Sequence, residues 1–198
     1  MSYITRLIHK IKNIYYRSRF KKFGRKSMLI NPKYIMGGEN IEIGNRVVIR
    51  DFAWLGALPL TGAADCRLVI GDGCVIGHFN ELFATNSVII EDNVLTADRV
   101  YISDNLHGYE DVSIPVVKQS IKQIGTVRIG EGSWLGAGVC VIGASVGKHC
   151  VVGANAVVTK DIPDYSVAVG IPARVVKRYD FELNAWRKTN AEGVFLND

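Results

Sequence analysis

The sequence predicts an all-β protein, a parallel β-helix assembled from hexapeptide repeats. The clearest repeats run from Ile129 to Pro163 and read IGEGSW, LGAGVC, VIGAS, VGKHCV, VGANAV and VTKDIP. Each unit opens with an aliphatic residue, a small or apolar residue recurs four positions later, and one slip at 141–145 interrupts the six-residue period. Because neither an α-helix nor a strand has this period, the pattern indicates coils that stack and bury a continuous core.

The composition agrees with one tightly turning domain plus appendages. The chain has 198 residues, 48% of them hydrophobic, and 20 glycines, which is enough for a sizeable core. We expect the glycines at coil corners, where Gly avoids the Cβ penalty of unusual backbone angles. Cys74 and Cys150 fall on small inward positions, as is typical of reduced core thiols in a cytoplasmic protein. The absence of an apolar run of about 18 residues and of a secretory signal favours the same location.

Residues 1–26 form a basic segment with nine Lys or Arg and no acidic residue. Its apolar residues fall largely on one helical stripe, so we expect an amphipathic helix. One interpretation is peripheral contact with an anionic membrane surface at the inner membrane face; the other is packing against the coil or a neighbouring subunit. The rest of the chain is richer in acidic than in basic residues, which argues against a nucleic-acid partner. The stripe consists of Ile4, Leu7, Ile8, Ile11, Ile14, Tyr15 and Phe23.

The predicted coil domain covers residues 35–178, and its first recognisable hexads begin near Ile41. A stretch at 57–68 breaks the period and is interpreted as a loop. The longest break, 108–127, predicts a loop that protrudes from the coil, because so long an excursion in a compact domain is usually functional or disordered. Residues 179–198 are predicted to form a short C-terminal helix and a tail that cover the open end of the stack. The apolar residues of that helix are Phe181, Leu183 and Trp186.

Three features together resemble a known family: the hexads, ISDNLHGY at Ile102–Tyr109, and TKDIPDYSVAVGIPARVVK at Thr159–Lys177. They resemble the left-handed β-helix acyltransferases, and most closely the bacterial sugar and polysaccharide O-acetyltransferases of the maltose and galactoside acetyltransferase type. The resemblance covers roughly Ile41 to Lys177. It implies a left-handed coil, a homotrimer, acetyl-CoA as co-substrate with no metal, and a sugar or glycan hydroxyl as acceptor, in surface polysaccharide biosynthesis.

Transfer of an acetyl group from a thioester to an alcohol needs a base, a donor to the oxyanion and alignment of both substrates. His107 closes the last coil position before the long loop and matches the family's catalytic His, so we expect it to be the general base. The other histidines lie in the basic segment or at ordinary hexad turns: His9, His78 and His149. Four groups could fix the tautomer of the His107 ring: Asp104, Glu110, Asp111 and a backbone carbonyl.

The resemblance also assigns the remaining site residues. The oxyanion and acetyl region corresponds to Trp134, Gly136 and Ala137. Coenzyme A is expected to contact Ala137, Ala154, Thr159, Lys160, Arg174 and Lys177, of which the basic residues suit its phosphates. The acceptor is expected near Asn80, Glu81, Thr85, Asn86 and Asn105.

Several alternatives use the same coil. An N-acetyltransferase of an amino sugar, free or nucleotide-linked, needs the same fold, as does an enzyme that acetylates an antibiotic or another xenobiotic. A non-enzymatic scaffold is a further alternative, against which the His segment and the tail argue. A γ-class carbonic anhydrase needs three His ligands for zinc, and the expected second His position is Val112. A sugar nucleotidyltransferase needs an additional α/β domain that about 40 N-terminal residues cannot supply.

Overall fold

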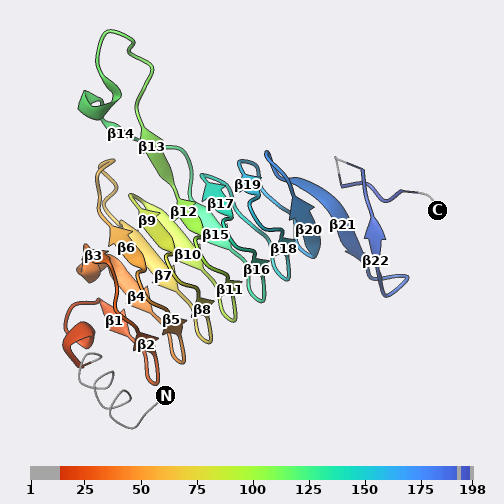
Figure 1. Ribbon diagram of the computed structural model, residues 1–198, viewed down its shortest axis with the longest axis horizontal. Helices are drawn as coiled ribbons and strands as arrows, with labels where there is room; N and C mark the ends of the chain where they lie inside the picture. Colours follow the sequence, from red (N-terminus) through yellow and green to blue (C-terminus); the bar gives the residue numbers. More distant parts are fainter. Residues whose placement is uncertain (1–13, 191–192, 197–198) are drawn as a thin grey trace.

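A computed structural model describes residues 14–190 and 193–196. Its strands wrap into an elongated prism in which each coil adds one strand to each of three faces (Figure 1). This arrangement confirms the parallel β-helix that the hexapeptide period predicts. In the part of the chain that the structure describes, no helix is long and apolar enough to cross a membrane.

The strands of each face pair in parallel from coil to coil. The first face contains β1 (Lys22–Phe23), β4 (Ile41–Ile43), β7 (Arg67–Ile70), β10 (Ser87–Ile90) and β15 (Val127–Ile129). The second face contains β2 (Met28–Leu29), β5 (Val48–Ile49), β8 (Val75–Ile76), β11 (Leu95–Thr96), β16 (Trp134–Leu135), β18 (Val151–Val152) and β20 (Ser166–Val169). The antiparallel strands β21 (Arg174–Asp180) and β22 (Ala185–Lys188) extend it. The third face contains β3 (Tyr34–Met36), β6 (Trp54–Ala57), β9 (Glu81–Ala84), β12 (Tyr101–Ser103), β17 (Cys140–Ile142) and β19 (Val157–Val158).

The remaining elements lie outside the three faces. A 3-10 turn, η1 (Gly38–Asn40), joins β3 to β4. The strands β13 (Asn105–His107) and β14 (Ile121–Gln123) pair with each other in antiparallel fashion, and η2 (Val116–Lys118) lies between them. We number the prism edges: corner 1 joins the first and second faces, corner 2 the second and third, and corner 3 the third and first.

The aliphatic residues that open the hexads stack in register inside the prism. Ile43, Ile70, Ile90 and Ile129 are consecutive partners on the first face, and each is at most 1% exposed. Burial of one such side chain contributes about 1.5–3 kcal/mol. Because neighbouring coils repeat this contact on all three faces, the core runs continuously along the prism.

Two different causes explain glycine at corner 1: unusual backbone angles and close stacking. Gly73 and Gly132 have φ angles of 71° and 69°, as the sequence predicts, whereas Gly71 and Gly147 do not have positive φ angles. A Cβ on Gly71 would lie 2.4 Å from Asp92 Oδ1, and one on Gly147 would lie 2.4 Å from Asp164 Oδ1. At Gly71 and Gly147 glycine is therefore needed because the next coil passes too close for any side chain.

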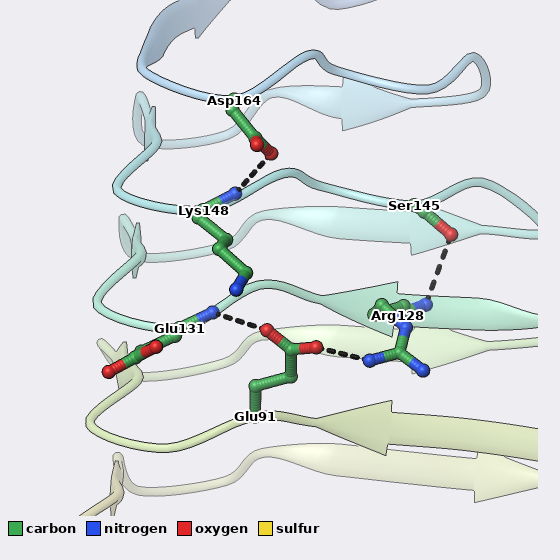
Figure 2. Close-up of polar contacts among 6 residues, drawn as sticks. All are labelled: Glu91, Arg128, Glu131, Ser145, Lys148 and Asp164. Carbon is green, nitrogen blue, oxygen red and sulfur yellow. Dashed lines mark hydrogen bonds and ion pairs between the residues drawn. The ribbon is translucent and has the colours of Figure 1, made fainter.

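Side chains of neighbouring coils cap the backbone N–H groups at corner 1. The Lys148 N–H donates to Asp164 Oδ1 of the next coil at 2.8 Å (Figure 2). For Glu131, the next coil presents Lys148 at the equivalent position, and lysine has no hydrogen-bond acceptor. The Glu131 N–H therefore donates to Glu91 Oε2 of the preceding coil, at 2.9 Å. Burial opposes the charge of Glu91, but this N–H and the Arg128 guanidinium prevail and lower its pKa.

The coil begins earlier than the sequence pattern indicates. Phe23 pairs in register with Ile43 and Leu29 with Ile49, so the first coil starts at β1 rather than near residue 35 or 41. The predicted helix is therefore wrong beyond residue 17: the described part is helical only at 14–17, because Phe23 continues into the stack. The rest of that prediction, residues 1–13, lies outside the described residues.

The predicted C-terminal helix is also wrong, because residues 179–189 belong to the β21–β22 hairpin. Asp180 accepts the backbone N–H groups of Glu182 and Leu183, and Asn184 has a φ of 50°, which closes the turn. Trp186 pairs with Tyr179 across the hairpin. The apolar spacing that suggested a helix therefore spans a turn and a short strand.

Candidate active site

A long arm projects from corner 3, directly after β12 (Figure 1). We define the arm as residues 104–126; it contains β13, η2 and β14 and corresponds to the predicted protruding loop 108–127, except that it begins at 104 and Val127 already belongs to β15. His107 lies in β13, pairs with Ile121, and is exposed. The proposed base therefore stands near the root of the arm, where it is accessible from outside the prism.

The three carboxylates considered as partners of the His107 ring are engaged elsewhere. Asp104 is fully buried and accepts hydrogen bonds from the preceding coil. Glu110 forms an ion pair with Lys122, which lowers the pKa of this carboxyl to about 2. Asp111 accepts the Ser113 hydroxyl at 2.6 Å, which lowers its pKa as well.

Residues predicted at the acceptor site divide into two groups. Asn80 is fully buried in the prism, where its amide donates to the Ala97 carbonyl at 2.8 Å and its carbonyl accepts the Thr96 hydroxyl at 2.8 Å. Its predicted contact with an acceptor is therefore wrong: it is a core residue whose hydrogen bonds are all internal. Thr85 and Asn105 are buried as well and bond to Asp104. The partly exposed members of the set are Glu81 and Asn86.

Corner 2 contains the predicted oxyanion position, Ala137, whose backbone N–H lacks the side-chain cap found two coils earlier at His78. The His78 N–H donates to Asp98 Oδ1 of the next coil at 2.8 Å. Ala137 is the equivalent of Asp98 one coil later, and Ala154 follows it. Because alanine has no side-chain acceptor, Ala154 cannot cap the Ala137 N–H in the same way.

The neighbouring predicted residues have different environments. The Gly136 N–H donates to the Val152 carbonyl at 2.8 Å, so it serves the ladder between coils and leaves Ala137 as the candidate donor. A Cβ on Gly136 would lie 2.7 Å from the Ala154 nitrogen, which explains glycine at this position. Trp134 is 47% exposed on β16, between Leu95 and Val151.

A pocket of about 380 Å³ lies where the last coil meets the C-terminal hairpin. It brings together Lys160 and Arg174, both predicted from the tail motif, and adds Arg178, which sequence reasoning missed. Arg178 comes directly after the matched tail, so a search one residue further would have found it. Three cations and one carboxylate, Asp161, line the pocket, which suits the phosphates of a nucleotide. Thr159, Ala154 and Lys177 are exposed but are not among its lining residues.

The described residues contain no group of three or more His, Cys, Asp or Glu arranged to hold a metal ion. The four cysteines are free thiols, and burial raises the pKa of Cys66 and of Cys74 to about 11. Thiolates of Cys66 and Cys74 are therefore scarce near neutral pH.

Comparison with known proteins decides the family. A model described as the hexapeptide repeat of succinyl-transferase matches residues 126–160. WbbJ of Escherichia coli K12, named as a candidate lipopolysaccharide biosynthesis O-acetyl transferase, is 33% identical over 164 residues, which cover 79% of this chain and 81% of that protein. The chain belongs to the hexapeptide-repeat acetyltransferases.

Other members agree with this assignment. A candidate acetyltransferase of Mycobacterium tuberculosis is 37% identical over 156 residues, which cover 78% of this chain and 48% of that protein. The chain therefore spans about half the length of this relative. The solved N-acyltransferase AntD from Bacillus cereus, in complex with dTDP and 3-hydroxybutyryl-CoA, superposes with a TM-score of 0.69 at 21% identity, over 87% of this chain and 90% of AntD. A maltose O-acetyltransferase from Clostridium difficile 630 gives a TM-score of 0.52 at 25% identity, over 87% and 76%. These likenesses confirm the left-handed β-helix fold.

Proposed function

We propose that the protein transfers the acetyl group of acetyl-CoA to a sugar hydroxyl during the synthesis of a surface glycan. The observation that carries the proposal is the place of His107: exposed, near the root of the arm, within the segment that matches the family's catalytic His. The name of the WbbJ relative supports an O-linked acceptor in lipopolysaccharide biosynthesis.

In this mechanism His107 takes the proton from the acceptor hydroxyl as its oxygen attacks the thioester carbonyl. The carbonyl oxygen becomes negative, and the Ala137 N–H donates to it. The carbon–sulfur bond then breaks, the acetyl group stays on the sugar oxygen, and the proton passes from His107 to the leaving thiolate. Lys160, Arg174 and Arg178 hold the phosphates of coenzyme A.

The proposed base and oxyanion donor require more than one copy of the chain. His107 extends from corner 3, whereas Ala137 lies at corner 2 of the next coil. The six steps from Ala137 to Gly143 cross the third face between these corners, roughly 15–20 Å at the rise of a strand. Since both groups must reach the same carbonyl, we propose a homotrimer in which the arm of one subunit meets corner 2 of its neighbour.

Mixed trimers test this arrangement together with the chemistry. His107→Ala and Ala137→Pro are each expected to be inactive as homotrimers, by free-thiol release from acetyl-CoA with a surface-glycan fragment as acceptor. Trimers assembled from both variants contain interfaces with a native His107 and a native Ala137, so activity should return. Failure of the mixture, with mixed assembly verified by native mass spectrometry, would exclude a shared site.

N-acylation of a nucleotide-linked amino sugar is the second candidate. The fold likeness to AntD, solved with dTDP, favours testing it. An amine acceptor needs a base only to remove the proton of its ammonium form, so the same His107 can serve. Assays with simple sugars, amino sugars and nucleotide-linked amino sugars separate the two: turnover restricted to amines would replace O-transfer with N-transfer.

We also propose that the basic N-terminal segment holds the enzyme at an anionic membrane surface on the cytoplasmic side. Phe20 is buried and β1 and β2 belong to the first coil, so the test must leave residues from 14 onward intact. We expect the full-length chain to bind phosphatidylglycerol vesicles in a salt-dependent manner. A variant with Arg6, Lys10 and Lys12 changed to Gln should bind more weakly; equal binding would exclude this role.

A further inference from the structure

The two excursions of the chain leave the prism along the same edge, corner 3 (Figure 1). Loop 58–66 follows β6, and the arm follows β12; residues 85–86 make the turn of the coil between them. Polar side chains from all three segments meet at the base of the arm. We call them the arm-root cluster: Thr61, Thr85, Asp104 and Gln123.

Asp104 fastens the outgoing strand of the arm to the preceding coil. Its carboxylate accepts three consecutive backbone N–H groups, those of Thr85, Asn86 and Ser87, each at 2.8 Å. The Asn105 side-chain amide donates to it as well, at 2.9 Å. Asp104 is fully buried, so water cannot replace these bonds. Each buried donor left without an acceptor costs about 1–3 kcal/mol.

Gln123 fastens the returning strand to the same point. Its side-chain amide donates to the Asp104 carbonyl at 3.0 Å and to the Gly125 carbonyl. Its side-chain oxygen accepts from the hydroxyl of Thr61 at 3.0 Å and lies 2.9 Å from that of Thr85. One side chain thus connects the arm, the adjacent coil and loop 58–66.

We propose that Asp104 and Gln123 are positioning residues that fix the angle of the arm and, through it, the location of His107. Asn105 and Gln123 face each other at the base of the β13–β14 ladder, and His107 and Ile121 form the pair two residues further out. A change of angle at the base therefore moves His107. The inference rests on the proposed function, because it assumes that His107 acts on the acceptor.

The test compares two variants of adjacent residues in the full-length protein. Gln123→Met keeps the length of the side chain and removes all its hydrogen bonds. Lys122→Met is the matched control: it removes the ion pair with Glu110, a contact within the arm rather than between arm and prism. A milder variant, Thr61→Val, removes a single contact to Gln123 and guards against failure of Gln123→Met to fold.

We expect Gln123→Met to lower kcat about 10- to 100-fold, because a misplacement of about 1 Å has this effect, with KM for acetyl-CoA unchanged. Hydrogen exchange should rise at residues 105–107 and 121–123 and stay constant in the coils. Thr61→Val should show a smaller decrease of the same kind. Lys122→Met should retain kcat and the exchange pattern.

Three results would overturn the proposal: an unchanged kcat in Gln123→Met, an equal loss in Lys122→Met, or faster exchange throughout the coils. The exchange measurement does not depend on activity. If the native protein acetylates no acceptor, the proposed function fails, whereas local loosening in Gln123→Met would still support the fastening of the arm. If activity is present and exchange at the arm root does not change, the positioning role fails alone.

Discussion

Asp164 and Asp104 perform the same local task at two corners of the prism. Asp164 is exposed at corner 1 and accepts one backbone N–H, that of Lys148 in the neighbouring coil, at 2.8 Å (Figure 2). Asp104 at corner 3 is fully buried and accepts three such N–H groups from the neighbouring coil. At corner 1 water can take over the bond, whereas at corner 3 it cannot. The same residue type therefore closes a turn in one place and fastens the arm in the other.

The largest expected effect comes from Asp104→Ala. It leaves three buried N–H groups without an acceptor, so we expect a loss of about 3–5 kcal/mol in the free energy of unfolding. Asp164→Ala is the matched control and should lose about 0.5–1 kcal/mol, because water replaces the carboxylate. Denaturant unfolding of both variants at one protein concentration measures the difference. Equal losses of unfolding free energy in Asp104→Ala and Asp164→Ala would contradict the difference that we draw between the buried and the exposed carboxylate.

Corner 2 offers a third environment to compare with corners 1 and 3, because Ala137 is exposed and no side chain among the described residues caps its N–H. Gly138 has a φ of 71° and the Val139 N–H donates to the Gly136 carbonyl at 3.3 Å, which places Ala137 at the position of a type II turn where Pro is favoured. Ala137→Pro should therefore remove the donor without disturbing the fold. We expect kcat to fall about 10²–10³-fold.

Two further variants test this result for Ala137. Ala137→Gly retains the N–H and should retain kcat. Ala154→Asp supplies the missing acceptor, as Asp98 does for His78, and should lower kcat while leaving the melting temperature unchanged or higher. Full activity in Ala137→Pro would exclude this N–H as the oxyanion donor.

The cationic pocket at the end of the prism gives a smaller effect, on binding alone. Arg174→Gln removes one of the charges that we propose to hold a coenzyme phosphate, so KM for acetyl-CoA should rise about tenfold with kcat unchanged. Arg174→Lys should recover part of this loss, because it keeps the charge without the bidentate geometry. A decrease in kcat with constant KM would assign Arg174 to the chemistry instead.

The smallest effect concerns pH at corner 1. The pKa of Glu91 is lowered in the folded protein, so its contribution to stability is present above the ordinary value of 4.5 and is lost as pH falls through the lowered pKa. Glu91→Gln should therefore have a shallower loss of melting temperature between about pH 5 and 3 than the native protein. A parallel decline in both proteins would contradict the role of Glu91.

The sequence pattern predicts the coil and the arm well because both depend on local period. Ile129 and its equivalents repeat every six residues, and the arm is the place where the period stops. The pattern fails where a residue's role depends on another coil. In the sequence Asn80 looks like an accessible polar residue. In the structure it lies inside the prism and bonds to Thr96, sixteen positions later in the chain.

The arm-root cluster could not be inferred for the same reason. Asp104 meets Thr85 across 19 residues and Gln123 meets Thr85 across 38, distances set by the coil and by the length of the arm. The prediction for the C-terminal hairpin fails for a different reason. Phe181 and Trp186 fit a helical stripe, and only the turn chemistry of Asp180 and Asn184 distinguishes a hairpin from a helix here.

The stack also closes across the arm as if the arm were absent. The strand that follows the arm, β15, pairs in register with β10 of the preceding coil, from Val88 with Val127 to Ile90 with Ile129. In-register stacking therefore continues across an interruption of 23 residues between Ser103 and Val127. Because the entropy cost of closing a loop grows slowly with its length, we expect arms of other lengths to fit the same prism as long as the root stays fastened.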